Sequence, residues 1–304
     1  MFSLAFNSIM ILAAFMLVGF VCGKKGIITD SGTAALSGLL LNATLPALMI
    51  MSLQKDFDAS LLKNGAVIVA AFLATQAVGA ALGLILCRLF KVEGSEKNVW
   101  VFELIFANIA YMGIPVVKSL YGSGDAMFYV AMCGFAFNFL VFSLGVKLMA
   151  GAETKIDFKA IAVSPPIITT AIGFALFVFS VKLPATLSSA LESLGDMTTP
   201  LSMIITGSIL SRSDFKSVFT DRKMYVPHFV RLIALPLITF YGLRPFIKDE
   251  TALGTLVTLT GMPTASLVVV LATRYNGDAK TASRFVFVTT IASMFTIPAI
   301  TILF

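Results

Sequence analysis

The chain has 304 residues, of which 58% belong to the hydrophobic set AVILMFWYC and only 12% are charged, and its mean hydropathy is +0.95. A soluble domain carries about 25% charged residues, so this composition excludes a water-soluble globular protein and predicts an all-α polytopic membrane protein. The net charge of +6 comes without a basic cluster interleaved with aromatic residues, so no nucleic-acid partner is expected.

The chain carries few reactive residues. One histidine and three scattered cysteines give no spacing typical of a His/Cys metal site or of a disulfide framework. There is no phosphate-cradling loop, and no cofactor is expected. The string Gly122-Ser-Gly124-Asp125 matches a motif of intramembrane aspartyl proteases, but the chain offers no suitable Tyr-Asp partner for it. We therefore expect no enzymatic activity.

Ten apolar segments are long enough to cross a bilayer as helices, which takes about 20 residues each. In chain order they are 3–22, 32–53, 64–90, 98–120, 126–149, 160–180, 186–210, 224–246, 251–273 and 281–303. The connections between them are short and hold most of the charged residues. The sequence therefore predicts ten membrane-spanning helices and no extramembrane domain.

Lysine and arginine are unevenly distributed among these connections. Fifteen lie in or beside odd-numbered connections and six in or beside even-numbered ones. Because cytoplasmic loops carry the excess of basic residues, this bias predicts a multi-pass protein of the cell membrane with both termini non-cytoplasmic. The N-terminus has neither a basic n-region nor a small-residue cleavage pattern, so no cleavable signal peptide is expected.

Three pairs of similar strings occur in the same order in the two halves of the chain. Two of the pairs are separated by 153 or 154 residues and one by 148. The pairs are Asn42–Ile50 with Asp196–Ile204, Gly113-Ile-Pro115 with Gly261-Met-Pro263, and Tyr121–Ala126 with Tyr275–Ala279. Residues 1–150 and 156–304 are thus predicted to be copies of five helices each. Because five is odd, the second copy is inverted, an arrangement typical of secondary transporters.

The fourth and ninth segments each contain Gly-x-Pro, as Gly113-Ile-Pro115 and Gly261-Met-Pro263. Proline removes a backbone donor and clashes with the preceding turn. Unpaired peptide groups are costly in hydrocarbon, so breaks there must face protein or a wet cavity. If the two helices cross at their breaks, two half-helix N-termini meet near mid-membrane and attract an anion such as a carboxylate. A plain proline kink is the alternative interpretation.

The stretch Asn108 to Pro115, the repeated Gly-x-Pro, the five-plus-five organisation and the short connections resemble the auxin efflux carrier family, over essentially the whole chain. That family includes plant PIN and PIN-like proteins and bacterial malonate or malate permease-like proteins. The resemblance implies the crossover fold shared with bile-acid sodium symporters and sodium/proton antiporters. It implies a scaffold, about 1–55 and 156–212, that forms a homodimer, and a mobile transport unit, about 63–150 and 224–304.

The resemblance also implies transport of organic monocarboxylates or dicarboxylates. Two departures limit what carries over from plant relatives. Thr260 precedes Gly261 where plant carriers place an asparagine near the crossover, so their selectivity is not transferred to this chain. The long central cytoplasmic loop of PIN proteins is absent, and regulation through such a loop is not expected.

Asn108 is the strongest polar candidate for substrate contact, since its amide can donate to a carboxylate, although interhelical hydrogen bonding is its alternative role. Thr260 and Thr264 flank the second Gly-x-Pro and are predicted either to contact substrate or to bond back to their own helix. Further candidates for lining the site are Asn42 and Thr198 in the second and seventh segments.

Three residues are candidates for coupling or ion support. Glu103 lies five residues before Asn108 and is predicted either to take part in coupling or to extend to the cytoplasmic surface. Gln76 and Asn138 are uncharged candidates in the third and fifth segments. His228 and Arg231, near the start of the eighth segment, are expected at a solvated interface, and a proton relay through His228 is the alternative.

The sequence thus predicts a secondary transporter of small organic anions, with carboxylates of the malonate, malate or auxin type as the expected substrates, working by elevator-type alternating access. Its expected partners are the substrate anion and the lipid bilayer. Asn108, Gly113, Pro115, Thr260, Gly261, Pro263 and Thr264 are expected to form the anion site. Two other classes stay open: an ion channel that uses the same breaks as a pore, and a membrane sensor with vestigial transport. Sodium held by carbonyls freed at the breaks is the least favoured form of coupling.

Overall fold

The computed structural model describes residues 2–151, 154, 156–212 and 222–303. Throughout this part of the chain the secondary structure is helical, apart from one isolated β-bridge. Among the described residues, six helices are long and apolar enough to cross a membrane: Phe6–Lys24, Asp30–Leu53, Ala59–Phe90, Asp125–Ala150, Tyr225–Leu243 and Ala279–Leu303. Two shorter apolar helices are Ile109–Tyr121 and Pro165–Val178. The chain is a polytopic membrane protein, as its composition predicts.

The α-helices are α1 Phe2–Lys24, α2 Asp30–Leu39, α3 Leu45–Leu53, α4 Ala59–Phe90, α5 Gly94–Ile105, α6 Ile114–Tyr121, α7 Asp125–Leu140, α8 Val146–Ala150, α9 Phe158–Ala162, α10 Pro165–Val178, α11 Ala185–Asp196, α12 Thr198–Leu210, α13 Tyr225–Phe229, α14 Leu235–Leu243, α15 Glu250–Thr260, α16 Leu267–Arg274 and α17 Ala279–Ile300. Short π-helical turns are η1 Leu40–Thr44, η2 Ile109–Gly113, η3 Val141–Gly145 and η6 Val230–Ala234, and 3₁₀ turns are η5 Arg222–Met224 and η7 Thr301–Leu303.

Several predicted segments are divided rather than continuous. The segment predicted at 160–180 consists of α9 and α10, and the proline pair at Pro165 opens α10 because proline suits the first turn of a helix. The segment predicted at 186–210 consists of α11 and α12, which meet at Met197. The basic connection predicted after 210 extends over residues 213–221, which lie outside the described residues.

Three of the π-helical turns end two residues before a proline. These prolines are Pro46 after η1, Pro115 after η2 and Pro236 after η6. A proline inside a helix clashes with the carbonyl four residues earlier and cannot bond to it. A π-helical turn widens the helix at that point and re-pairs the backbone. The prolines therefore bend these helices without interrupting them.

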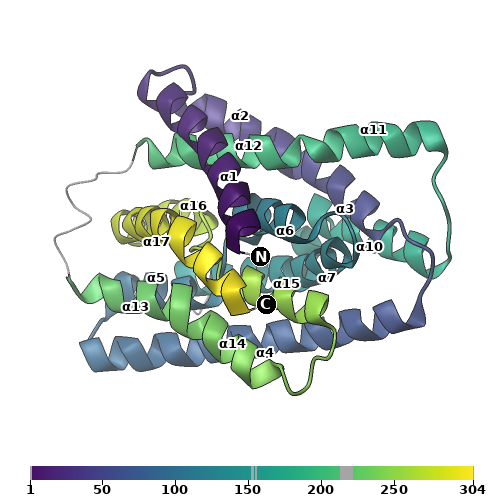
Figure 1. Cartoon of the computed structure of the whole chain (residues 1–304). Helices are drawn as coiled ribbons and strands as arrows, with labels where there is room; N and C mark the ends of the chain where they lie inside the picture. The colour runs from purple at the N-terminus through teal and green to yellow at the C-terminus, as the bar shows by residue number, and fades with distance from the viewer. Residues whose placement is uncertain (1, 152–153, 155, 213–221, 304) are drawn as a thin grey trace.

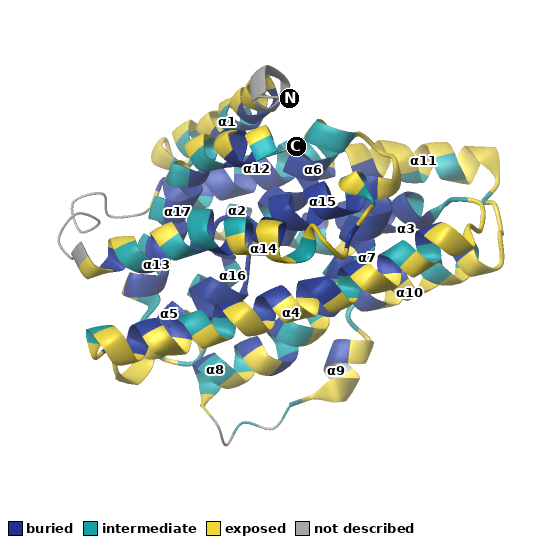
Figure 2. Ribbon diagram, turned by 60° about the horizontal axis from the view of Figure 1, so that its bottom comes forward, coloured by how far each residue is buried: buried dark blue, intermediate teal, exposed yellow. Residues whose placement is uncertain are grey.

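The interrupted helices lie in the interior of the molecule. Figure 1 shows α4 along one side and α11 with α12 along the opposite side, with α6, α15 and α16 between them. In Figure 2 the buried residues concentrate on α15, α6 and α7, whereas α1, α4, α10 and α11 carry exposed faces. Many of the exposed residues are large and apolar, such as Leu17, Leu89 and Phe179, as expected for a lipid-facing surface.

Helices α1 and α12 pack with their backbones nearly in contact. A Cβ atom added at Gly207 of α12 would lie 1.9 Å from the carbonyl oxygen of Met16 on α1. A Cβ atom added at Gly19 of α1 would lie 2.0 Å from the carbonyl oxygen of Ile204. Between membrane helices, such close approach replaces the hydrophobic effect as a source of stability. These two glycines therefore fix how α1 sits on α12.

We expect Gly207→Leu to separate α1 from α12 and to lower the midpoint of thermal unfolding of the detergent-purified protein. The added side chain meets backbone, which cannot rotate away, and overpacking costs about 1–3 kcal/mol. Gly242→Leu on α14 is the matched control, since nothing lies within 4 Å of its Cβ position. Equal midpoints for the two variants, measured by heating and gel filtration, would show that this contact is unimportant.

Candidate functional site

Two helices are interrupted at positions that face each other. Helix α5 ends at Ile105, and helical structure resumes at Ile109 in η2, which continues into α6. Helix α15 ends at Thr260, and α16 begins at Leu267. From the start of α5 to its end, 12 residues at about 1.5 Å each cover roughly 18 Å, a little over half of a hydrocarbon layer of about 30 Å.

The two interruptions are hydrogen-bonded to each other. The amide of Asn108 donates to the carbonyl oxygen of Pro263 at 2.7 Å, and the amide of Ala265 donates to the carbonyl oxygen of Phe106 at 3.0 Å. Together they form an isolated antiparallel bridge between Ala107 and Thr264. Peptide groups released from the two helices thus satisfy one another, which the low-dielectric interior demands.

The two N-terminal half-helix ends also meet. Asn108 is the N-cap of η2, with its side-chain Oδ1 accepting from the amide of Tyr111 at 3.3 Å. Ser266 is the N-cap of α16, and the Nδ2 of Asn108 donates to its Oγ at 3.3 Å. Asn108 is only 2% exposed. Two partial positive charges of helix N-termini therefore lie next to each other around one buried amide.

The first interruption lies earlier than the Gly-x-Pro motif predicts. The helix runs through Gly113 and Pro115, with Pro115 in the first turn of α6, so the break falls at 106–108 instead. The cause is η2, whose π-helical bonds accommodate the proline. Gly113 instead allows close packing, since a Cβ there would lie 2.9 Å from the side chain of Leu259 on α15. The second interruption does include Gly261 and Pro263.

One arginine binds the ends of both preceding half-helices. Arg231, in η6, donates from Nε to the carbonyl oxygen of Met262 at 3.1 Å and from Nη1 to that of Leu104 at 3.2 Å. Leu104 lies in the last turn of α5, and Met262 follows the end of α15. The side chain is 1% exposed. Its charge neutralises the partial negative charges of two helix C-termini, which would otherwise repel each other.

Glu103 and His228 form a buried pair beside this arginine. The Oε1 of Glu103 lies 2.6 Å from Nδ1 of His228, and it also accepts from the hydroxyl of Thr264 at 3.4 Å. Glu103 is fully buried and His228 is 4% exposed. The sequence-based expectation that His228 and Arg231 lie at a solvated interface is therefore wrong. Packing against α5 and α17 removes both side chains from the exposed surface of the protein.

Four carbonyl groups at the interruptions are already engaged. Those of Leu104 and Met262 accept from Arg231, and those of Phe106 and Pro263 accept from backbone amides. A sodium ion would have to compete with these bonds for its oxygen ligands. Clusters of three or more acidic, histidine or cysteine residues that could hold a metal ion do not occur in the described parts of the chain.

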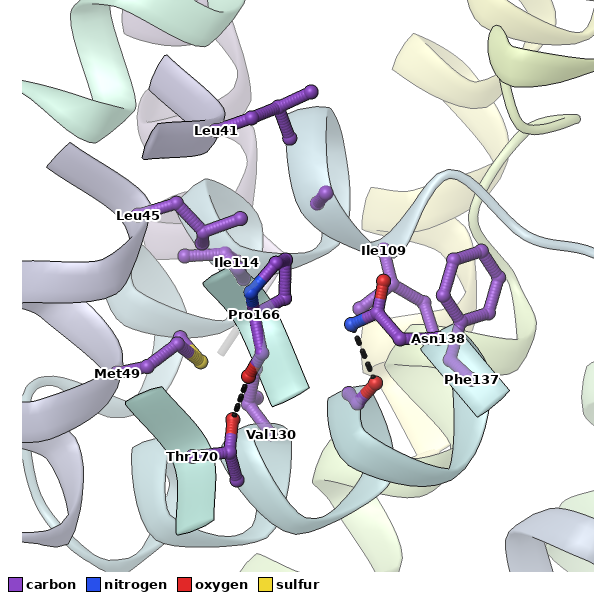
Figure 3. Close-up of a pocket in the computed structure, with 12 residues that line it drawn as sticks. Leu41, Leu45, Met49, Ile109, Ile114, Val130, Phe137, Asn138, Pro166 and Thr170 are labelled. Carbon is purple, nitrogen blue, oxygen red and sulfur yellow. Dashed lines mark hydrogen bonds between the residues drawn. The ribbon is translucent and has the colours of Figure 1, made fainter. Parts of the chain in front are cut away.

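A cleft opens next to the first interruption. It encloses about 440 Å³, open space at its mouth included, and lies between α3 and α10 on one side and η2, α6 and α7 on the other. Figure 3 shows Asn138 and Thr170 with their side chains at this cleft, among apolar side chains such as Ile109 and Met49. Its lining is largely apolar, as is typical of small-molecule sites.

The polar groups of the cleft are few. Nδ2 of Asn138 donates to the carbonyl oxygen of Gly134, and the hydroxyl of Thr170 donates to that of Pro166, both within their own helices (Figure 3). Ala110 belongs to the first turn of η2, where amides lack an intrahelical acceptor, and it lines the cleft. The cleft therefore adjoins the N-terminal end of a half-helix.

The remaining predicted residues have local partners or lie elsewhere. The hydroxyl of Thr260 donates to the carbonyl oxygen of Leu256 in its own helix. Asn42 is exposed and donates to the carbonyl oxygen of Gly38, so the structure does not bring its amide to the interruptions. Thr198 is fully buried in the first turn of α12, and Gln76 is buried on α4.

Sequence reasoning missed Ser266 as a member of this site and misplaced His228 and Arg231. A signal for Ser266 exists, because serine is a preferred N-cap and here follows a proline-containing break. A signal for the other two also exists, since charged residues inside an apolar segment usually face the protein interior.

Comparisons with known proteins show the family of this chain. The family model described as Membrane transport protein matches residues 4–301. "Uncharacterized transporter MJ1031" of Methanocaldococcus jannaschii is 25% identical over 95% of each chain. "Uncharacterized transporter YfdV" of Escherichia coli is 20% identical over 93% of this chain and 92% of its own.

A third relative, named "Putative malonate transporter", comes from Rhizobium meliloti and is 26% identical over 71% of this chain and 69% of its own. The family match extends over nearly the whole sequence, including all residues of the two interruptions. The chain therefore belongs to the family of membrane transport proteins, as its resemblance to auxin efflux carriers predicts.

Proposed function

We propose that this protein is a secondary transporter of small organic anions, most of all carboxylates, which it carries across the cell membrane by alternating access. The observation that carries the proposal is the contact between two helix N-termini at Asn108 and Ser266, buried between two interrupted helices. Interrupted helices whose N-termini point at an anionic group are the usual binding element of such carriers.

The anion site would consist of the two N-caps and the first turns that follow them. A carboxylate there would receive hydrogen bonds from amides of η2 and α16 and from the amide group of Asn108. Thr264 lies in the second interruption. The hydroxyl of Thr289 accepts from its amide and donates to its hydroxyl, and these two bonds would fix the backbone of the interruption. The rest of the substrate would occupy the adjoining apolar cleft.

The cleft separates two groups of helices, which suggests how movement would occur. In the proposed elevator, the scaffold comprises about 1–55 and 156–212, the transport unit about 63–150 and 224–304, and the scaffold also forms a homodimer. Two inverted five-helix copies, 1–150 and 156–304, would supply the alternate conformations. The antiparallel direction of the bridge between Ala107 and Thr264 supports inversion of the two copies. Both termini would lie outside the cytoplasm.

The test is uptake and counterflow exchange in proteoliposomes across malonate, malate, succinate, lactate and indole-acetate. A carrier gives saturable uptake, and internal substrate accelerates the entry of labelled external substrate. A channel would pass current without saturation at low substrate and without counterflow. The absence of counterflow with every acid of this panel, in vesicles that contain folded protein, would refute the proposal.

We expect Gly134→Phe to block transport while leaving the fold intact. Gly134 lines the cleft, and nothing lies within 4 Å of a Cβ atom placed there, so a large side chain would fill open space. Gly134→Ala is the matched control and should retain most of the exchange activity. Counterflow measured on both variants checks the prediction. Full activity of the phenylalanine variant would place the substrate path elsewhere.

A further inference from the structure

All buried, charge-bearing side chains of the described chain lie in one cluster. Among its aspartate, glutamate, lysine, arginine and histidine residues, only Glu103, His228 and Arg231 are buried. They come from α5, α13 and η6, and Glu103 precedes His228 by 125 residues in the sequence. Ionisable groups inside a membrane protein are costly and mark sites of ion or proton handling more often than sites of plain structural support.

We propose that Glu103 and His228 form a proton-binding site, and that the protein takes up one proton with each monovalent organic anion. This inference rests on the proposed transport function and deepens it by naming the coupling ion. The pair lies at hydrogen-bond distance, 2.6 Å, so one proton can be held between a carboxylate oxygen and an imidazole nitrogen. Histidine is the side chain that changes charge within the physiological pH range.

The charges of the cluster balance before the proton binds. An ionised Glu103, a neutral His228 and the guanidinium of Arg231 together carry no net charge, and Arg231 donates to the carbonyl oxygen of Leu104, the residue next to Glu103. Adding a proton to the pair gives the cluster one positive charge. That charge is costly when buried alone but is compensated when an anion occupies the neighbouring interruption.

Thr264 connects the proton site to the anion site. Its hydroxyl donates to Oε1 of Glu103, and it lies two residues before the N-cap Ser266. A bound anion therefore favours the protonated cluster by attraction in a low-dielectric interior. By reciprocity, the protonated cluster raises affinity for the anion by the same factor. The two ligands would then cross the membrane together.

Apart from Arg231, no charged side chain of the described chain is buried near the pair, so no other buried group there could bind the proton. From α17, Phe285 meets the His228 ring edge-on at 4.7 Å, and Thr289 contributes an uncharged hydroxyl. The charged residues of α17 and of the first turns of α5 lie at exposed or half-buried positions: Lys280, Arg284, Glu96 and Lys97. Oε2 of Glu103 and Nε2 of His228 have no hydrogen-bond partner among the described residues.

Transport in proteoliposomes with an imposed pH gradient tests the coupling. For a monocarboxylate, one-to-one symport should give about tenfold accumulation per pH unit, because one unit corresponds to 1.36 kcal/mol. Protein-free liposomes correct for passive diffusion of the protonated acid. Glu103→Gln and His228→Gln should lose pH-driven accumulation even where counterflow exchange persists. Thr239→Ala, buried in α14 and bonded within its own helix, is the control and should keep both.

The outcomes separate this inference from the proposed function. Wild-type counterflow without any effect of the pH gradient would overturn proton coupling and leave transport standing. Accumulation that persists in both glutamine variants would assign the proton to another site. Absence of counterflow in the wild type would instead refute the transport function itself.

A second measurement does not depend on the variants being active. Trp100 is the chain's lone tryptophan, fully buried one turn before Glu103, and its ring lies 6.1 Å from Phe285, which contacts His228. Its fluorescence should titrate with pH in the purified protein, and substrate should shift that titration to higher pH. The titration should be absent in His228→Gln. A profile that is flat in the wild type, or unchanged by substrate, would contradict the proposal.

Discussion

Asn108→Ala is expected to reduce counterflow exchange about tenfold or more without reducing the amount of protein in the membrane. The substitution removes the N-cap of η2, which is worth about 1 kcal/mol. It also removes the hydrogen bond to Ser266, worth about 0.5–1.5 kcal/mol. Both contacts hold amides in the orientation that a carboxylate would meet, and a factor of ten corresponds to about 1.4 kcal/mol.

The matched control is Asn42→Ala, which removes the same side chain from a different helix. The amide of Asn42 is exposed and bonded only within its own helix, so exchange should stay near the wild-type rate. Both variants are compared for membrane content, gel-filtration profile and substrate affinity. Wild-type affinity in Asn108→Ala, or equal losses in the two variants, would remove Asn108 from the proposed site.

Arg231→Met should cause the largest loss of stability among these variants. Two buried carbonyl groups, those of Leu104 and Met262, would lose their donors, and each unsatisfied group costs about 1–3 kcal/mol. In addition, Glu103 would lose the compensating positive charge. We expect a much lower midpoint of thermal unfolding in detergent, together with a loss of exchange activity.

Arg231→Lys and a double variant show which of these effects dominates. A lysine keeps the charge but offers a single ammonium group, which cannot reproduce the planar fork that reaches both carbonyls. If the charge of Glu103 contributes, adding Glu103→Gln to Arg231→Met should restore part of the midpoint, and the double-mutant cycle measures the coupling. A midpoint of Arg231→Met within error of the wild type would contradict the assigned role.

The position of the interruptions illustrates the reach of local sequence signals. The motif Gly261-Met-Pro263 predicts its break correctly, whereas Gly113-Ile-Pro115 lies within a helix that continues through it. The two motifs differ in the turn that precedes them, since a π-helical turn at 109–113 re-pairs the backbone ahead of Pro115. Gly113 of this turn packs against Leu259 of α15, a contact that the proline alone does not reveal.

The residues around the interruptions divide in the same way. Asn108 stands out in the sequence because an asparagine beside a predicted break needs partners. His228 and Arg231 stand out less, since their place near the end of a predicted segment also fits a solvated position. Only their contacts with Glu103, Leu104 and Met262 show that they are buried, and these contacts span 125, 127 and 31 residues of the sequence.

By itself the sequence determined the membrane environment, the helical class, the transporter family and the approximate place of the two polar breaks. The membrane environment and the helical class follow from composition and from the apolar length that a bilayer imposes on each helix. The family and the polar breaks follow from the repeated Gly-x-Pro motif and the stretch around Asn108. The tertiary structure alone decided which carbonyl groups accept hydrogen bonds from Arg231, that Glu103 is the acid paired with His228, and that Ser266 is the N-cap bonded to Asn108. These contacts join segments about 30 to 160 residues apart in sequence, and backbone groups freed from a helix bond to whatever the packed neighbours present.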